Sequence, residues 1–224
     1  MKIFLDTSDV DVIRQHCETG LIDGVTTNPT LMMQAGRDSV EVIKEISSLF
    51  PEHASISAEV VGDTAEEMIS QAEDYYSISK NITIKVPCTV EGLRACKTLS
   101  DKDIPVNVTL IFSLEQAILS AKAGATYVSP FIGRCQDNNI DGIDLIKSIK
   151  KVYNMNHISV YNMNNISTNI LAASIRNVAH IGQAFEAGAD VVTLPPSIFE
   201  EMYKHDLTDQ GIKQFDKDWK KLNS

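Results

Sequence analysis

Short β-rich segments alternate with longer amphipathic segments along the whole of this 224-residue chain. A strand turns successive side chains to opposite faces, whereas a helix repeats its apolar positions every three or four residues. This pattern predicts eight strands, at residues 2–6, 24–27, 55–60, 82–86, 105–110, 126–129, 169–174 and 191–194. Helical patterns fill the gaps, at residues 10–18, 38–49, 64–78, 90–100, 114–123, 142–152, 178–187 and 197–204, and a further amphipathic helix is predicted at about 208–222.

Eight alternating β and α units predict an α/β fold. The arrangement that they favour is a closed (β/α)₈ TIM barrel with an additional C-terminal helix, forming a single domain over residues 1–224. A doubly wound open sheet is the alternative. The chain has no pair of glycines in G-x-G spacing, which excludes the dinucleotide-binding version of that sheet.

The central predicted strands have one apolar face and one polar face. In the segment 82–86, Thr83 and Lys85 share a face, and three aliphatic side chains occupy the other. The polar faces of segments 55–60 and 105–110 carry Ser57, Glu59, Asn107 and Thr109. An apolar outer face suits contact with a ring of helices, and a polar inner face suits an active site at the barrel mouth.

Composition narrows the choice of partners. The formal net charge is −10 and the isoelectric point about 4.9, so the surface as a whole repels nucleic acid and anionic membranes. The four cysteines have no C-x-x-C spacing, and the first apolar run is too short for a signal peptide. We therefore expect a cytoplasmic protein with reduced thiols and with neither a nucleic-acid nor a membrane partner.

Polar side chains lie at or just after the C-terminal ends of the predicted strands. In a barrel these ends converge on one cavity. The residues are Asp6, Asn28, Glu59, Lys85, Asn107, Thr109, Ser129, Arg134, Ser174 and Arg176.

Lys85 is the centre of this group. An isolated lysine on a strand is usually a surface residue. A lysine that points into a barrel is desolvated, which favours the neutral amine that can attack a ketone and form an imine. Asp6 and Glu59 add two carboxylates that can move protons during such a reaction, although each alone could equally be an ion-pair partner.

Arg134 and Arg176 are two of only five arginines in the chain, and both follow predicted strand ends. Each comes with a serine, Ser129 or Ser174, and guanidinium and hydroxyl groups together bind phosphate well. Solubility is the alternative role for the arginines, but it explains neither their positions nor their scarcity.

Two patterns typical of metal sites are incomplete. The sequence Asp137-x-Asn139-x-Asp141-Gly142 matches the first half of an EF-hand loop, but Ser148 stands where the bidentate glutamate is required. The five histidines form no pair with metal-ligand spacing. We therefore expect no metal site.

Long motifs along the chain resemble the transaldolase family in its short form, which also contains fructose-6-phosphate aldolase. They are F-L-D-T at 4–7, G-V-T-T-N-P-T-L at 24–31, I-K-V-P-x-T at 84–89, E-G-L at 91–93, N-V-T-L-I-F-S at 107–113, A-G-A-T-Y-V-S-P-F-I-G-R at 123–134, I-L-A-A-S-I-R-N at 170–177 and T-D-Q-G-I-K-Q-F-D-K-D-W at 208–219. The resemblance covers essentially the whole chain. It implies a class I, Schiff-base mechanism with no metal or organic cofactor.

The resemblance also implies a role for each matching residue. Lys85 matches the imine-forming lysine, Asp6 the acid/base aspartate, and Glu59 and Thr109 the pair that holds the catalytic water. The groups that match those binding the dihydroxyacetone unit are Asn28, Asn107 and Ser129, and those matching the phosphate clamp are Arg134, Ser174 and Arg176.

The family reaction transfers a dihydroxyacetone unit from sedoheptulose 7-phosphate to glyceraldehyde 3-phosphate, giving erythrose 4-phosphate and fructose 6-phosphate in the pentose phosphate pathway. Glu59 and Phe131 match the transaldolase branch, because the aldolase that releases free dihydroxyacetone has glutamine and tyrosine at these positions. That aldolase is the main alternative. A catalytically silent sugar-phosphate-binding barrel and a phosphosugar isomerase or epimerase are more distant ones.

The C-terminal helix carries an apolar stripe. Ile212, Phe215, Trp219 and Leu222 fall on one face, which could dock on the chain's own barrel or on a neighbouring subunit. Relatives in the short form assemble as rings, so the resemblance implies a homo-oligomer, a pentamer or decamer, in which this helix reaches a neighbour.

Overall fold

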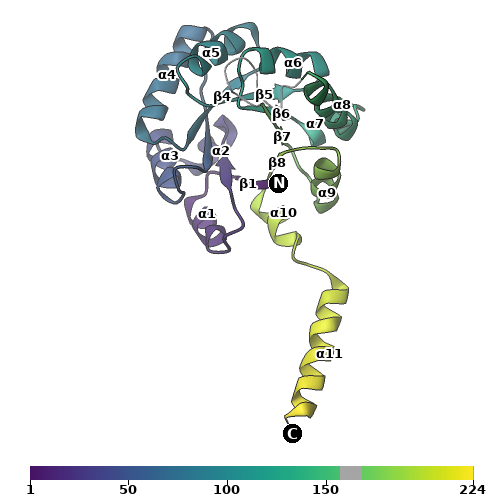
Figure 1. Cartoon of the computed structure of the whole chain (residues 1–224). Helices are drawn as coiled ribbons and strands as arrows, with labels where there is room; N and C mark the ends of the chain where they lie inside the picture. Colours follow the sequence, from purple (N-terminus) through teal and green to yellow (C-terminus); the bar gives the residue numbers. More distant parts are fainter. Residues whose placement is uncertain (157–167, 224) are drawn as a thin grey trace.

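The computed structural model describes residues 1–156 and 168–223. Eight parallel strands form a closed barrel in chain order, with β8 paired to β1, and helices surround it (Figure 1). The strands are β1 (Lys2–Asp6), β2 (Gly24–Thr26), β3 (Ser55–Glu59), β4 (Ile82–Pro87), β5 (Val106–Ile111), β6 (Tyr127–Pro130), β7 (Asn169–Ala172) and β8 (Val191–Leu194). The predicted (β/α)₈ barrel is confirmed.

The described helices cover each connection between strands and the end of the chain. They are α1 (Val10–Cys17), α2 (Pro29–Ala35), α3 (Ser39–Ser48), α4 (Ala65–Ile78), α5 (Val90–Ser100), α6 (Leu114–Lys122), α7 (Ile132–Asp137), α8 (Gly142–Met155), α9 (Val178–Glu186), α10 (Pro196–Glu201) and α11 (Asp206–Leu222). The sequence predicts a variable loop or helix end for the Asn- and Met-rich stretch 154–167. This stretch begins within the last turn of α8, and its residues 157–167 lie outside the described residues.

Two short helices, α2 and α7, were not predicted. Helix α7 has only six residues, too few for a periodic pattern to be recognised, and no residue of α2 is buried. The signal for α2 is local: Asn28 caps its N-terminus by accepting a hydrogen bond from the Leu31 N–H at 3.0 Å, and Pro29 occupies the first helical position. Both helices directly follow strands, so they stand at the mouth of the barrel.

The barrel interior contains an apolar cluster as well as polar side chains. Strands β1, β6, β7 and β8 contribute a compact buried cluster of Phe4, Tyr127, Leu171, Ala173 and Val191. The polar side chains on the inner faces of β3, β4 and β5 include buried hydrogen-bonded groups, such as Ser55 and Thr83, which share a hydrogen bond of 2.8 Å. The larger core lies outside the barrel, between the outer strand faces and the helices.

Strand β7 ends earlier than the predicted boundary at residue 174. Ser174 adopts a left-handed backbone conformation, with φ of 59°, which departs from extended geometry. Leu110 has a similar φ of 62° where the register between β5 and β6 shifts. Such conformations carry local strain and cluster at functional sites. Both residues line the cavity at the mouth of the barrel.

Helix α11 extends away from the barrel into solvent (Figure 1). None of its residues is buried, and Phe215 and Trp219 are 75% and 68% exposed. The structure therefore does not show this helix docked on its own barrel, which was one of the two arrangements considered above. Among the described helices, none is long and apolar enough to cross a membrane.

Candidate active site

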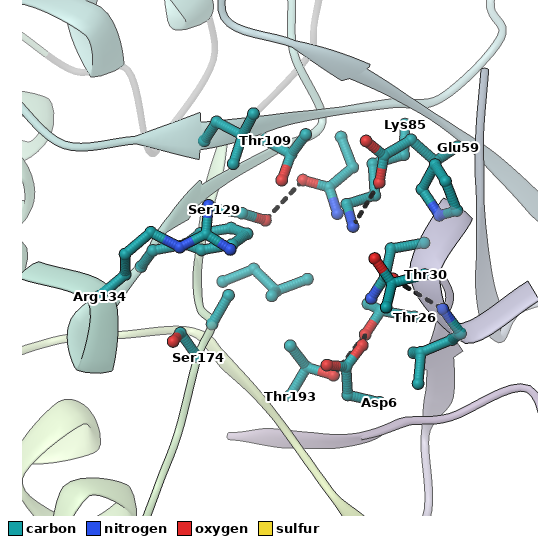
Figure 2. A pocket seen from close by; sticks show the side chains of 18 of the residues that line it. Asp6, Thr26, Thr30, Glu59, Lys85, Thr109, Ser129, Arg134, Ser174 and Thr193 are labelled. Atoms are coloured by element: carbon teal, nitrogen blue, oxygen red, sulfur yellow. Dashed lines mark hydrogen bonds and ion pairs between the residues drawn. The ribbon is translucent and has the colours of Figure 1, made fainter. Parts of the chain in front are cut away.

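A cavity of about 430 Å³ opens at the C-terminal ends of the strands. Ten of the residues that the sequence singled out line it together (Figure 2): Asp6, Asn28, Glu59, Lys85, Asn107, Thr109, Ser129, Phe131, Arg134 and Ser174. Arg176 does not line this cavity. It borders a neighbouring hollow that shares Asp6 and Ser174 with the main one.

Lys85 lies in the wall of the cavity with a side chain that is 7% exposed. Its Nζ contacts Glu59 Oε2 at 2.9 Å and donates a hydrogen bond to the carbonyl of Thr27 at 3.0 Å. Strands β3 and β4 pair Glu59 directly with Lys85, so the two side chains emerge side by side on the inner face. A buried ammonium group beside a carboxylate can pass its proton to that carboxylate and become a nucleophilic amine.

Asp6 belongs to a chain of hydrogen bonds across three strands. Thr26 Oγ1 donates to Asp6 Oδ1 at 2.8 Å, and Thr26 and Thr193 share a hydrogen bond of 2.6 Å. Because a hydroxyl has one hydrogen, Thr26 must accept from Thr193 while it donates to Asp6. Burial raises the pKa of Asp6, and this effect outweighs the opposing influences of the Lys85 charge and the Thr26 hydroxyl. The carboxyl group is therefore suited to both taking up and returning a proton.

Two amide side chains are held in fixed orientations. Ser129 Oγ donates to Asn107 Oδ1 at 2.7 Å, while Asn107 Nδ2 donates to Ser57 Oγ at 3.4 Å. The Asn28 carbonyl oxygen caps α2, which leaves its NH₂ group as the donor toward the cavity. Thr109 Oγ1 is buried and has no hydrogen-bond partner among the described residues, as expected for a hydroxyl that serves a bound molecule.

Arg134 lies on the opposite side of the cavity from Lys85 and Glu59, next to Ser174 (Figure 2). Its guanidinium stacks over the ring of Phe131, 4.9 Å from the ring centroid. The cavity therefore has a proton-handling end at Lys85 and a cationic end at Arg134. This polarity suits an elongated anionic substrate with a reactive carbonyl.

Within residues 1–156 and 168–223, no group of three or more His, Cys, Asp or Glu side chains is placed to hold a metal ion.

Comparison with known proteins places the chain in a family. Residues 3–224 match the family model described as transaldolase/fructose-6-phosphate aldolase. The chain belongs to this family. A probable transaldolase from Caulobacter vibrioides is 51% identical over 219 residues, covering 98% of this chain and 96% of that protein. One from Paracoccus denitrificans is also 51% identical, over 221 residues, covering 99% of this chain and 97% of the relative.

Solved structures show the same fold at low sequence identity. Thiamine phosphate pyrophosphorylase from Pyrococcus furiosus aligns with a TM-score of 0.58 and 15% identity, covering 86% of this chain and 85% of its own. A mutant flavocytochrome b2 with benzoylformate aligns with a TM-score of 0.62 and 9% identity, covering 88% of this chain and 57% of the other. These likenesses concern the barrel alone. The family membership makes the chain an enzyme of the aldolase/transaldolase type.

Three buried hydroxyl residues of this family member were not among the predicted site residues. Thr26 and Thr193 support Asp6, and Ser57 supports Asn107. The period-two alternation of a strand could have indicated Thr26 and Ser57 as residues of the site. Thr26 is two positions before Asn28, and Ser57 shares its strand face with Glu59. The contact of Thr193 with Thr26 requires the closure of β8 onto β1, which no local pattern gives.

Proposed function

We propose that this enzyme is a class I transaldolase, which transfers a dihydroxyacetone unit between sugar phosphates through an imine on Lys85. The observation that carries the proposal is the buried Lys85 amine, 2.9 Å from the Glu59 carboxylate in a cavity that also contains Asp6. A nucleophile with a base beside it is the arrangement that covalent catalysis requires.

The reaction begins with the transfer of a proton from Lys85 to Glu59. The free amine attacks the C2 carbonyl of the ketose phosphate, and loss of water gives a protonated imine. Asp6 takes the proton of the C4 hydroxyl, the C3–C4 bond breaks, and its electron pair forms an enamine as the imine nitrogen becomes neutral. The shortened aldose phosphate leaves.

A second aldose phosphate then reverses these steps. The enamine carbon attacks the aldehyde carbon, and Asp6 returns its proton to the new hydroxyl. Water then hydrolyses the imine, which releases the lysine and a ketose phosphate three carbons longer than the acceptor aldose. We assign the holding of that water to Thr109 and Glu59, which line the cavity together with Lys85. We assign the binding of the hydroxyls of the three-carbon unit to Asn28, Asn107 and Ser129, which line the same cavity. Arg134, Ser174 and Arg176 bind the phosphate. We propose sedoheptulose 7-phosphate as donor and glyceraldehyde 3-phosphate as acceptor, as in the pentose phosphate pathway.

Group transfer rather than free cleavage is proposed because of two residues beside the enamine, Glu59 and Phe131. An aldolase must protonate the enamine carbon quickly, whereas a transaldolase must preserve the enamine until an aldose arrives. The Phe131 ring has no hydroxyl that could supply such a proton. Fructose 6-phosphate alone should therefore release dihydroxyacetone slowly, and added erythrose 4-phosphate should give fast turnover. Equal rates with and without the acceptor, in a coupled assay, would identify a free aldolase.

The double substitution Glu59→Gln with Phe131→Tyr should shift this partition toward free cleavage. We expect the ratio of dihydroxyacetone release to group transfer to rise about tenfold or more, because only about 1.4 kcal/mol in the relative barriers is needed. The same coupled assay measures both rates on one preparation. Phe112→Tyr, which alters the ring that packs 5.9 Å from Phe131, is the matched control and should leave the ratio unchanged. An unchanged ratio in the double variant would contradict the assignment to these two residues.

We further infer that the enzyme is a cytoplasmic homo-oligomer, a pentamer or decamer, in which α11 packs against a second copy of the chain. The support is the apolar stripe of α11, whose four large side chains are 54–81% exposed: Ile212, Phe215, Trp219 and Leu222. Four free thiols, at Cys17, Cys88, Cys96 and Cys135, are compatible with a reducing compartment.

Removal of α11 should reduce the assembly without unfolding the barrel. A chain that ends before residue 206 loses no buried residue, so we expect an unchanged far-ultraviolet spectrum per barrel residue and a smaller species in analytical ultracentrifugation. Phe215→Ser with Trp219→Ser should act in the same direction, and Lys213→Ser with Lys217→Ser on the same helix serves as the control. An assembly of unchanged subunit number after truncation would refute the proposed interface.

A further inference from the structure

A forked ion pair holds Arg176 at the rim of the site. Arg176 Nη1 and Nη2 donate to Asp137 Oδ1 and Oδ2 at 3.1 and 2.5 Å. The two side chains are 52% and 51% exposed, so the pair is a surface contact between the loop after β7 and the last residue of α7. The Arg176 backbone N–H also donates to Nδ1 of the buried His180 at 3.5 Å, which ties the same residue to α9.

The glycine at position 133 makes room for this arrangement. A Cβ atom on Gly133 would lie 2.4 Å from the backbone oxygen of Ser174 and 2.7 Å from both Cγ and Nε of Arg176, closer than such atoms can approach. The Arg176 side chain therefore crosses the first turn of α7 on its way to Asp137 at the end of that helix. Arg134 follows Gly133 directly. Helix α7 therefore carries Arg134, and its last residue, Asp137, holds Arg176.

We propose that Asp137 is a positioning residue, which holds the Arg176 guanidinium ready for the phosphate group of the sugar substrate. This inference rests on the function proposed above, in which Arg176 binds that phosphate. Asp137 itself does not touch the substrate. In the sequence, Asp137 belongs to the incomplete EF-hand pattern. In the structure, its carboxylate pairs with Arg176.

We expect Asp137 to order the Arg176 side chain rather than to stabilise the fold. An exposed ion pair contributes little to the folding free energy, and Arg37 and Glu45 form another exposed two-point pair. The pair of Asp137 differs in its place, because Arg176 borders the hollow that shares Asp6 and Ser174 with the cavity. A free arginine has many rotamers, and a phosphate that binds it must select one of them. Asp137 engages two of the five N–H donors of the guanidinium and fixes its plane, so the side chain is ordered before the phosphate arrives.

The experiment compares a phosphorylated with an unphosphorylated ketose in borohydride trapping of the Lys85 imine. In Asp137→Asn and Asp137→Ala, the concentration of fructose 6-phosphate that gives half-maximal trapping should rise about two- to tenfold, the effect expected from one side chain that is no longer ordered. The half-maximal concentration of dihydroxyacetone, and the maximal trapping rate with either ketose, should stay as in the unmodified enzyme. A general structural defect would change the half-maximal concentrations of both ketoses alike.

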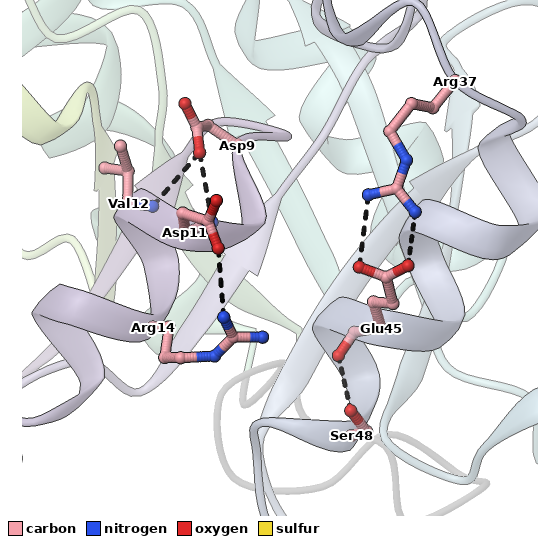
Figure 3. A network of polar contacts seen from close by, with 7 residues as sticks. All are labelled: Asp9, Asp11, Val12, Arg14, Arg37, Glu45 and Ser48. Carbon is pink, nitrogen blue, oxygen red and sulfur yellow. Dashed lines mark hydrogen bonds and ion pairs between the residues drawn. The ribbon is translucent and has the colours of Figure 1, made fainter.

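Asp11→Asn is the control, because Asp11 forms an exposed pair with Arg14 at 3.0 Å (Figure 3) and neither residue lines the cavity. The Asp11→Asn substitution should leave the half-maximal concentrations of both ketoses unchanged. An unchanged value for fructose 6-phosphate in both Asp137 variants would overturn the inference, and a lower value would mean that Asp137 competes with phosphate and would overturn it as well. Absence of any adduct in the unmodified enzyme would instead refute the imine mechanism, so the two failures are distinguishable.

Discussion

Lys85→Met is expected to abolish catalysis while leaving the barrel folded. We expect kcat/KM to fall by at least about 10⁴-fold, because removal of a covalent nucleophile eliminates the imine pathway itself. Methionine occupies a similar volume and places no charge in the wall of the cavity. Lys85→Arg should be equally inactive, since a guanidinium keeps the positive charge beside Glu59 but cannot form the imine.

Borohydride reduction in the presence of fructose 6-phosphate provides the direct measurement. Mass spectrometry should find a stable adduct on the peptide that contains Lys85 in the unmodified enzyme and no adduct in either variant. Lys80→Met is the control, because Lys80 is a lysine near the start of the same strand, with its Nζ 4.3 Å from the centre of the Tyr76 ring. An adduct on a lysine other than Lys85 would show that the nucleophile has been assigned wrongly.

Much of this architecture could be predicted from the sequence because it depends on local periodicity. The alternation of Thr83 and Lys85 with aliphatic neighbours indicates which side chains face the interior, and eight repeats of strand and helix indicate the barrel. Since parallel strands of a barrel direct their C-terminal ends to one mouth, residues as distant in sequence as Asp6 and Ser174 could be placed in one cavity.

The features that were not predicted depend on contacts between distant segments. Asp137 and Arg176 meet because α7 and the loop after β7 lie next to each other, and neither segment has a periodic pattern that indicates this. The direction of α11 is a similar case, because an amphipathic pattern identifies an apolar face without identifying what covers it. Sequence reasoning therefore located the charged groups of the site better than the contacts that orient them.

Asp6→Asn is expected to lower activity severely and to alter the pH dependence of stability. An amide can neither accept the C4 hydroxyl proton nor return it, so we expect kcat to fall about 10²- to 10⁴-fold. Imine trapping with dihydroxyacetone should remain, because formation of the imine uses Lys85 and Glu59. Loss of trapping together with turnover would contradict the separate role of Asp6 in cleavage of the carbon–carbon bond.

The stability effect follows from the direction of the pKa shift. Burial raises the pKa of Asp6 above its ordinary value of 3.8, so the folded state binds a proton more readily than the unfolded state does. The stabilisation from this proton is present below the ordinary value and is lost as pH rises through the higher, folded value. The amide introduced by Asp6→Asn has no charge at any pH, so the unfolding free energy of this variant relative to the unmodified enzyme should increase as the pH rises above the ordinary value of 3.8.

Denaturant unfolding at a series of pH values measures this difference, and Thr193→Val tests its cause. That substitution keeps the Asp6 carboxylate but removes the hydroxyl that donates to Thr26, so Thr26 becomes a weaker donor to Asp6. The pKa of Asp6 should rise further, and the acid limb of the kcat/KM profile should move to higher pH, because the ionised carboxylate is the base that cleavage requires. A profile that stays in place would mean that Thr193 does not affect the pKa of Asp6, and that the hydrogen bond between Thr26 and Thr193 serves packing rather than proton transfer.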